Sequence, residues 1–268
     1  MTRFFPVPSR FWILLSLATV AAGCGVSSGP QAAPVPAEGK AITFPTPLGT
    51  GMGKWFPPPE VDSRVPAIVV LHGDHGLTST VEDYARDLAG RGFAVVCIDL
   101  YHGEKIDSLL DAHIMDRGLP EERVHADVRG AVDWLAARSE VDSRRIGMIG
   151  WEMGASHALE TALRDSRFSA LVFCYGRLIT DPDQLRPLRA NVLALFAGKD
   201  EGNPPETRAA FARAMSDAGK SLTLQVFDES DHGFMNPPKG TTPNAEDTKA
   251  AEKAWSRILT FFLHEWPR

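Results

Sequence analysis

The sequence predicts an α/β fold, namely a mostly parallel, eight-stranded sheet with helices on both faces. One observation is alternation, because apolar strand-like runs and amphipathic helix-like runs follow one another along most of the chain. Another is the character of the strands: "VPAIVVLHG" and "FAVVCIDLY" lack polar alternation, which is typical of strands buried on both faces. Residues 41–268 are long enough for one such domain, and no internal repeat divides them.

Eight segments have the composition of strands. The first two, residues 40–45 and 51–58, are predicted to form a short antiparallel pair ahead of the parallel part of the sheet. The other six are rich in valine, isoleucine, leucine and phenylalanine: 65–73, 93–101, 145–151, 168–176, 191–200 and 221–228.

Five segments have helical patterns, and they fall between or after the parallel strands: 79–93, 122–138, 154–165, 204–219 and 246–266. Ser79 or Thr80 is the predicted N-cap of the first helix, and Gly92 stands near its end. The pattern is weak between Tyr101 and Glu121, which predicts a loop or a cap beside a pocket.

The N-terminal segment is predicted to be an export signal rather than part of the fold. Residues 1–23 carry two arginines, no acidic residue and an apolar run too short for a typical membrane span. They end in "AAGC", which resembles a bacterial lipobox and predicts lipid on Cys24; cleavage of an ordinary signal peptide is the alternative. Residues 24–40 are rich in Gly, Ser, Pro and Ala and are predicted to be a flexible tether. We expect an exported protein, anchored to a membrane and facing the periplasm or the cell exterior.

The net charge is −6, and removal of a signal with two arginines makes the mature chain more acidic. Charges of both signs are interspersed without a basic stripe, which argues against nucleic acid as a partner. A small molecule is the expected partner.

The motif that carries chemistry is "GWEMG", residues 150–154. A G-x-nucleophile-x-G turn between a strand and a helix is the nucleophile elbow of the α/β-hydrolase fold. The middle residue is Glu152, where serine, cysteine or aspartate is expected. This fold uses the chain order nucleophile, acid, histidine. Asp200 and His232 follow in that order, each just past a predicted strand, where sites in open α/β sheets gather.

At these residues the chain resembles the dienelactone hydrolase family. The resemblance covers nearly all of residues 41–265 and rests on "VVLHGDHGL", "DYARDLAGRGFAVVCIDLY", "RIGMIGWEMGAS", "AGKDEGNPP" and "DHGFMNP". It implies a hydrolase with cysteine, less often serine, at position 152, the acid at Asp200 and the base at His232. It also implies an oxyanion hole made by the backbone N–H groups of Met153 and Asp74.

The chain departs from the family pattern at three places. Glu152 replaces the nucleophile, and Gly73 stands about where well-studied members carry a glutamate. The arginines that hold the carboxylate of dienelactone find no match, so dienelactone itself is not the expected substrate. Trp151, Tyr101 and Phe234 are candidates to line an apolar pocket, and each could equally belong to the core.

A carboxylate at the elbow suits a different reaction from that of a thiolate. Attack on an ester would form an anhydride, and the intermediate would expel the carboxylate rather than the more basic alkoxide. Haloalkane dehalogenases and epoxide hydrolases use an aspartate here to attack saturated carbon. Glu152 could therefore act as a covalent nucleophile, or as a base that positions water with His232. The alternative is a pseudoenzyme, a small-molecule-binding lipoprotein that has lost ester hydrolysis.

No cofactor and no metal is expected. His72 and His75, in "HGDH", resemble a metal pair, but four ligands are not evident in the sequence. His157 follows the elbow on the predicted helix and is expected to pack there; His125 and His102 show no sign of a site. The two cysteines of the domain, Cys97 and Cys174, lie on predicted strands that are separated by two others in this fold. At about 4.8 Å per strand they are too far apart for a disulfide.

Overall fold

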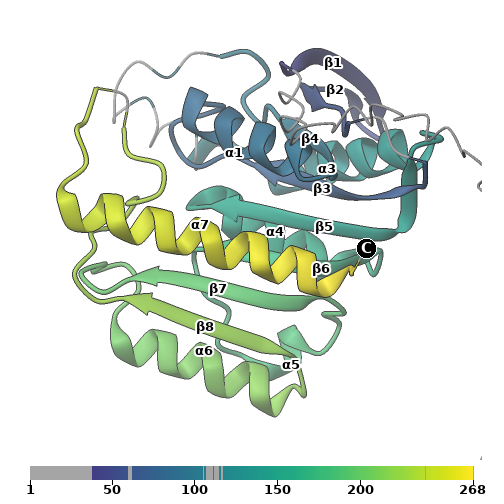
Figure 1. Ribbon diagram of the computed structural model, residues 1–268. Coiled ribbons are helices and arrows are strands. Elements are labelled where there is room, and N and C mark those ends of the chain that lie inside the picture. The colour runs from purple at the N-terminus through teal and green to yellow at the C-terminus, as the bar shows by residue number, and fades with distance from the viewer. Residues whose placement is uncertain are drawn as a thin grey trace, which may run out of the picture. The chain divides into compact units, whose positions relative to one another are not determined.

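Eight strands form one sheet in the order β1-β2-β4-β3-β5-β6-β7-β8 (Figure 1). Strands β1 and β2 pair antiparallel, as do β2 and β4, and the pairs from β4 through β3 to β8 are parallel. The predicted fold class is confirmed. The strand bounds are Lys40–Thr46, Gly49–Phe56, Val65–Leu71, Ala94–Ile98, Val141–Trp151, Phe168–Cys174, Asn191–Ala197 and Leu222–Phe227 for β1 to β8.

Helices cover both faces of the sheet. Their bounds are Ser79–Gly90 (α1), Glu121–Ala136 (α3), Met153–Arg164 (α4), Pro182–Leu185 (α5), Pro205–Asp217 (α6) and Ala245–Glu265 (α7). Helices α3 and α4 contact each other on one face, and Figure 1 shows α7 crossing in front of the sheet with α4 behind it. Helix α1 shares the face of α7, because Trp255 of α7 donates a hydrogen bond to Asp87 of α1.

The core lies in the central strands. Every residue of β3 and β4 is buried, because helices remove both faces of these strands from water. The outer strand β8 is only partly buried along most of its length. The continuous apolar runs of the sequence therefore correspond to the middle of the sheet, and the site described below stands at the carboxyl ends of these strands.

The computed structural model describes residues 38–59, 62–104, 106, 111, 115, 117–238 and 240–267. The predicted signal peptide, Cys24 and most of the predicted tether lie outside the described residues, as do residues 105, 107–110, 112–114 and 116 of the predicted loop between Tyr101 and Glu121. None of the described helices has both the length and the apolar character needed to span a membrane.

Two details of the predicted elements were wrong. The N-cap of α1 is Thr78, not Ser79 or Thr80, because the Thr78 hydroxyl accepts a hydrogen bond from the Val81 N–H. Helix α5 was not predicted; it is a single turn with Asp181 as its N-cap, too short for an apolar period. Cys97 and Cys174 are both free, with β3 and β5 between their strands, as predicted.

Candidate active site

The candidate nucleophile stands on a tight turn between β5 and α4. Glu152 has φ 54° and ψ −122°, a backbone conformation that costs free energy for any residue with a side chain. Two glycines permit the turn by allowing close backbone contact. A Cβ on Gly150 would lie 2.4 Å from the Gly154 carbonyl oxygen, and one on Gly154 would lie 2.2 Å from the His72 carbonyl oxygen. The chain thus has the complete backbone geometry of a nucleophile elbow around a glutamate.

The Glu152 carboxylate points back to the loop after β3. Its Oε2 accepts a hydrogen bond from the backbone N–H of Asp74, at 2.8 Å. A Cβ on Gly73 would lie only 2.1 Å from the same oxygen. The absence of a side chain at position 73 therefore makes room for the carboxylate, which accounts for two of the departures from the family pattern together.

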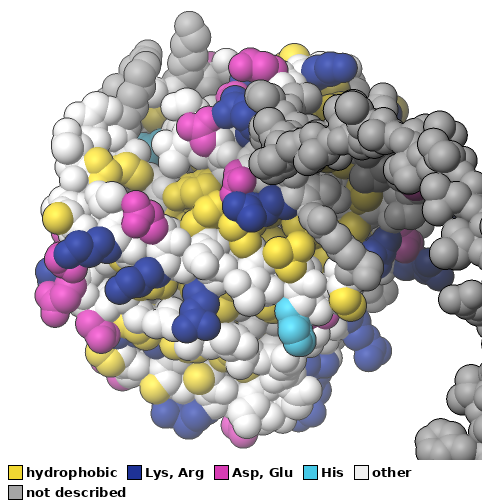
Figure 2. Space-filling view, viewed as in Figure 1, with side chains coloured by type: hydrophobic (Ala, Val, Ile, Leu, Met, Phe, Trp, Pro, Cys, Tyr) yellow, Lys and Arg dark blue, Asp and Glu magenta, His cyan; other side chains and the backbone are white. Residues whose placement is uncertain are grey.

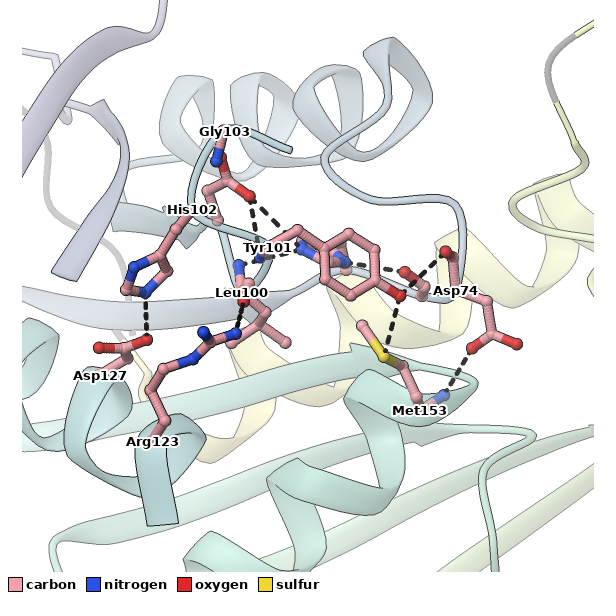
Figure 3. A network of polar contacts seen from close by, with 11 residues as sticks. Asp74, Leu100, Tyr101, His102, Gly103, Arg123, Asp127 and Met153 are labelled. Carbon is pink, nitrogen blue, oxygen red and sulfur yellow. Dashed lines mark hydrogen bonds and ion pairs between the residues drawn. The ribbon is translucent and has the colours of Figure 1, made fainter. Parts of the chain in front are cut away.

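The two predicted oxyanion donors both face carboxylates of this chain. The Asp74 N–H contacts Glu152, and the Met153 N–H donates to Oδ1 of Asp74 at 3.3 Å (Figure 3). The two N–H groups thus have different acceptors, a carboxylate oxygen of Glu152 and one of Asp74. In this structure a glutamate oxygen contacts the Asp74 N–H, which the resemblance assigns to a substrate oxygen in ester hydrolysis.

Buried polar contacts hold the loop of residues 72–74 in place. The Leu100 N–H donates to Nε2 of His72, so Nδ1 carries the proton and donates to the Gly73 carbonyl. Burial lowers the pKa of His72, which keeps the ring neutral. The Tyr101 hydroxyl donates to the Asp74 carbonyl and lies 3.3 Å from the Met153 sulfur (Figure 3). His72 is thus occupied by backbone groups, which leaves it no part in a metal pair with His75.

His232 and Asp200 form the second half of the site. Nδ1 of His232 lies 3.0 Å from Oδ2 of Asp200. Asp200 also accepts hydrogen bonds from the Asn203 side chain and the Gly202 N–H, which orient its carboxylate. Burial alone would raise the pKa of Asp200, but the hydrogen bonds from His232 and Asn203 outweigh it and lower that pKa. Asn203 was not predicted; its signal in the sequence is the polar "DEGN" directly after β7.

Three carboxylates act on His232. The hydrogen bond to Asp200 raises the pKa of His232, burial opposes it, and the charges of Asp200, Glu152 and Asp74 add to the rise. Oε1 of Glu152 is on the His232 side, since it would lie 3.3 Å from a Cβ on Gly233. The structure therefore brings the predicted Glu152, Asp200 and His232 to one place.

The predicted pocket residues take different positions. Phe234 lines a groove of about 350 Å³ together with Tyr84, Met235 and Trp255, between α1, α7 and the segment after β8. We call this the aromatic groove, and Figure 2 shows hydrophobic side chains gathered between α1 and α7 on this face. Trp151 is fully buried and stacks on Tyr84 from beneath, so it supports the groove without lining it.

Tyr175 is a further residue that the sequence did not single out. It has φ 42° and is fully buried, and its ring packs edge-on against His232 with centroids 5.3 Å apart. The same ring lies 5.5 Å from that of Phe234. Tyr175 therefore connects the histidine to the aromatic groove, a role that depends on contacts between distant segments.

The known proteins that this chain resembles include dienelactone hydrolases and a lactonase. The sequence profile of the dienelactone hydrolase family matches residues 54–266. A Bradyrhizobium sp. protein named "Probable 2-oxo-3-(5-oxofuran-2-ylidene)propanoate lactonase" is 28% identical over 216 residues, which are 76% of this chain and 85% of that protein. A dienelactone hydrolase-like promiscuous phosphotriesterase from metagenomic libraries has a similar fold, with a TM-score of 0.74 at 20% identity, over 84% of this chain and 97% of that one.

Proposed function

Because the chain belongs to the dienelactone hydrolase family, we propose that it is a hydrolase whose reaction passes through a covalent bond to Glu152. The observation that carries the proposal is the hydrogen bond from the Asp74 N–H to Oε2 of Glu152. It divides the carboxylate into two unlike oxygens. Oε2 is held by an oxyanion donor, and Oε1 is directed toward Gly233 and the neighbouring His232.

The first step is an attack of Oε1 on a saturated, electrophilic carbon of the substrate. The new bond joins Oε1 to that carbon, and the carbon's bond to its leaving atom breaks. A carboxylate needs no deprotonation for this step, and displacement at saturated carbon avoids the anhydride that attack on an ester would form. The product of the step is an alkyl ester of Glu152.

The second step is hydrolysis of that ester by water. His232, neutral at this point and oriented by Asp200, takes a proton from water as the hydroxide attacks Cδ of Glu152. Negative charge then develops on Oε2, which the Asp74 N–H already contacts at 2.8 Å. The intermediate expels the alkoxide, which takes the proton from His232, and Glu152 keeps one oxygen of the water.

The charges around the site favour an uncharged substrate. Asp74, Glu152 and Asp200 all raise the pKa of His232, so the resting site combines three carboxylates with a readily protonated imidazole. An anionic substrate would be repelled, and departure of an anion such as halide would be disfavoured. An epoxide fits better, because the oxygen released on ring opening can take the proton of His232, and that loss leaves the histidine neutral for the second step. The aromatic groove suits the apolar part of a small epoxide.

The place of this reaction is the outer side of a membrane. The "AAGC" sequence and the tether that follows support a lipid anchor on Cys24, with the hydrolase domain standing off the surface. The anchor and the catalytic proposal rest on separate residues, so each can fail without the other.

The deciding experiment is a single turnover in ¹⁸O-labelled water with enzyme in excess over styrene oxide, followed by mass analysis of the peptide that contains Glu152. We expect one ¹⁸O atom in the Glu152 carboxylate, because water attacks Cδ. Glu152→Gln should form no diol and take up no label. Diol formation with label only in the product would show that Glu152 acts as a base rather than a nucleophile, and would overturn the covalent proposal.

A further inference from the structure

A second group of polar side chains lies between helices α3 and α4, away from the residues assigned to hydrolysis. Glu121 and His125 stand one turn apart on α3, and His157 and Glu160 stand three residues apart on α4. One ligand atom each of Glu121, His125 and Glu160 lies within 4.8 Å of the other two. We call these four residues the α3–α4 cluster.

Three atoms of the cluster are buried without a hydrogen-bond partner. They are Nε2 of His125, Nδ1 of His157 and Oε2 of Glu160. His157 as a whole is only 7% exposed. Buried polar atoms without hydrogen-bond partners are costly, and two of these three, on His157 and Glu160, lie 3.5 Å apart, which indicates that something binds between them.

The distances suit a metal ion. Nδ1 of His157 lies 3.5 Å from Oε2 of Glu160, which is long for a hydrogen bond. Two ligand atoms on a tetrahedral zinc ion, each about 2.0–2.1 Å from the metal, stand roughly 3.3 Å apart. The pair therefore already has nearly the separation that shared coordination requires, and ligand atoms of Glu121 and His125 lie within 4.8 Å of one on Glu160.

Hydrogen bonds from neighbouring residues orient His125 and Glu160. Nδ1 of His125 lies 2.7 Å from the Thr161 hydroxyl, and a ring nitrogen that donates to a second-layer acceptor leaves Nε2 as the ligand atom. Arg177 donates to Oε1 of Glu160, so Oε2 remains on the side of the histidines.

From this geometry we propose that the α3–α4 cluster binds a divalent transition metal, zinc foremost, through His125, His157, Glu160 and Glu121. Two imidazoles and two carboxylates form a mixed nitrogen and oxygen set that suits zinc, and four protein ligands make a closed site. Its role is structural. Arg123 and Asp127 of α3 contact Leu100 and His102 (Figure 3), so an ion that joins α3 to α4 also steadies the segment that carries Tyr101.

The experiment measures zinc affinity on the full chain, purified in detergent and stripped of metal, by competition with a chromogenic chelator. We expect one zinc ion per wild-type chain. His125→Ala and Glu160→Gln should each weaken binding by at least about tenfold, as losses around zinc sites commonly do. His264→Ala, which removes an exposed histidine of α7, should bind as the wild type does.

Two further measurements keep the proposal open to refutation. Glu121→Gln changes an exposed ligand and should leave folding intact while it weakens binding, which covers the case in which His125→Ala fails to fold. Zinc should also raise the Tm of the wild type and of His264→Ala, but not that of Glu160→Gln. A wild type that binds no zinc, or cluster variants with wild-type affinity, would overturn the proposal and leave the cluster as an ion-pair network with Arg164 and Arg177.

Discussion

Gly73 and Glu152 share one small space, although Asp74, the residue next to Gly73, lies 78 positions before Glu152 in the chain. A Cβ on Gly73 would lie 2.1 Å from Oε2 of Glu152, and the next residue donates its N–H to that oxygen. The glycine and the glutamate therefore form a matched pair: a side chain at position 73 and this position of the carboxylate exclude each other.

The first prediction tests that pair. Gly73→Ala should destabilise the protein by about 1–3 kcal/mol, because the methyl group overlaps a buried carboxylate. In a Glu152→Ala background the same change should cost far less, with a coupling of at least about 1 kcal/mol in a double-mutant cycle measured by urea denaturation. Gly118→Ala is the matched control, since a Cβ there meets no atom within 4 Å. Equal costs in both backgrounds would show that the two positions do not compete.

The second prediction concerns ester hydrolysis. Glu152→Cys vacates the Asp74 N–H and supplies a thiol next to His232, so it should create hydrolysis of p-nitrophenyl acetate that the wild type lacks. Asp74→Ala in addition should raise this activity, because the Met153 N–H then loses its contact with Oδ1. His232→Ala should abolish it.

The esterase measurement needs one further check. Circular dichroism should show that Glu152→Cys keeps the wild-type fold before its activity is scored. A folded but inert Glu152→Cys variant would mean that the donors are no longer aimed at a substrate oxygen, and that the backbone of the elbow alone does not preserve the machinery.

The third prediction concerns the pKa of His232, which should lie above 6.5 in an NMR titration because Asp200 holds the charged ring. The folded state binds this proton more tightly than the unfolded state. The stability it contributes is therefore complete below about pH 6.5 and is lost as the pH rises through the folded pKa. Asp200→Asn should lower the pKa of His232 and flatten that dependence.

Asp231→Asn provides the control for that titration. It removes an acid directly beside His232 in sequence but leaves the 3.0 Å contact with Asp200 in place. An equal fall of the His232 pKa in both variants would show that general negative charge, and not the Asp200 hydrogen bond, sets it.

The fourth prediction concerns location. Cys24→Ala should move the protein from the membrane fraction to the soluble fraction of the cell envelope, because it removes the only residue proposed to carry lipid. Ser28→Ala, in the same predicted tether, should remain in the membrane fraction. Wild-type protein that is wholly soluble would refute the anchor and leave the hydrolase proposal untouched.

Much of the fold could be predicted from local patterns. The strand β3 is a run of seven buried apolar residues, and α3 repeats valine and leucine at helical spacing, so each segment shows its environment in its own residues. The predicted N-cap of α1 was wrong because residues 78–80 all carry a hydroxyl group that could cap the helix. In the structure Thr78 also donates a hydrogen bond to Asn236, which belongs to a distant loop and cannot be inferred from the local sequence. Helix α5 has only four residues and is too short to show an apolar period. The role of Tyr175 depends on its contacts with His232 and Phe234, so no local pattern predicts it.

The sequence by itself determined the order of the elements, the elbow at residues 150–154 and the places of Asp200 and His232 at strand ends, because periodicity, glycine and chain order are local properties. Only the tertiary structure decided what Glu152 contacts. Strands β3 and β5 are neighbours in the sheet, and that pairing brings the Asp74 N–H against the carboxylate and makes Gly73 necessary. The same holds for the α3–α4 cluster, whose residues form two separate pairs in the sequence and come together only where α3 packs against α4. Contacts across the sheet depend on how all the strands and helices of the core pack together. No single stretch of sequence contains that information.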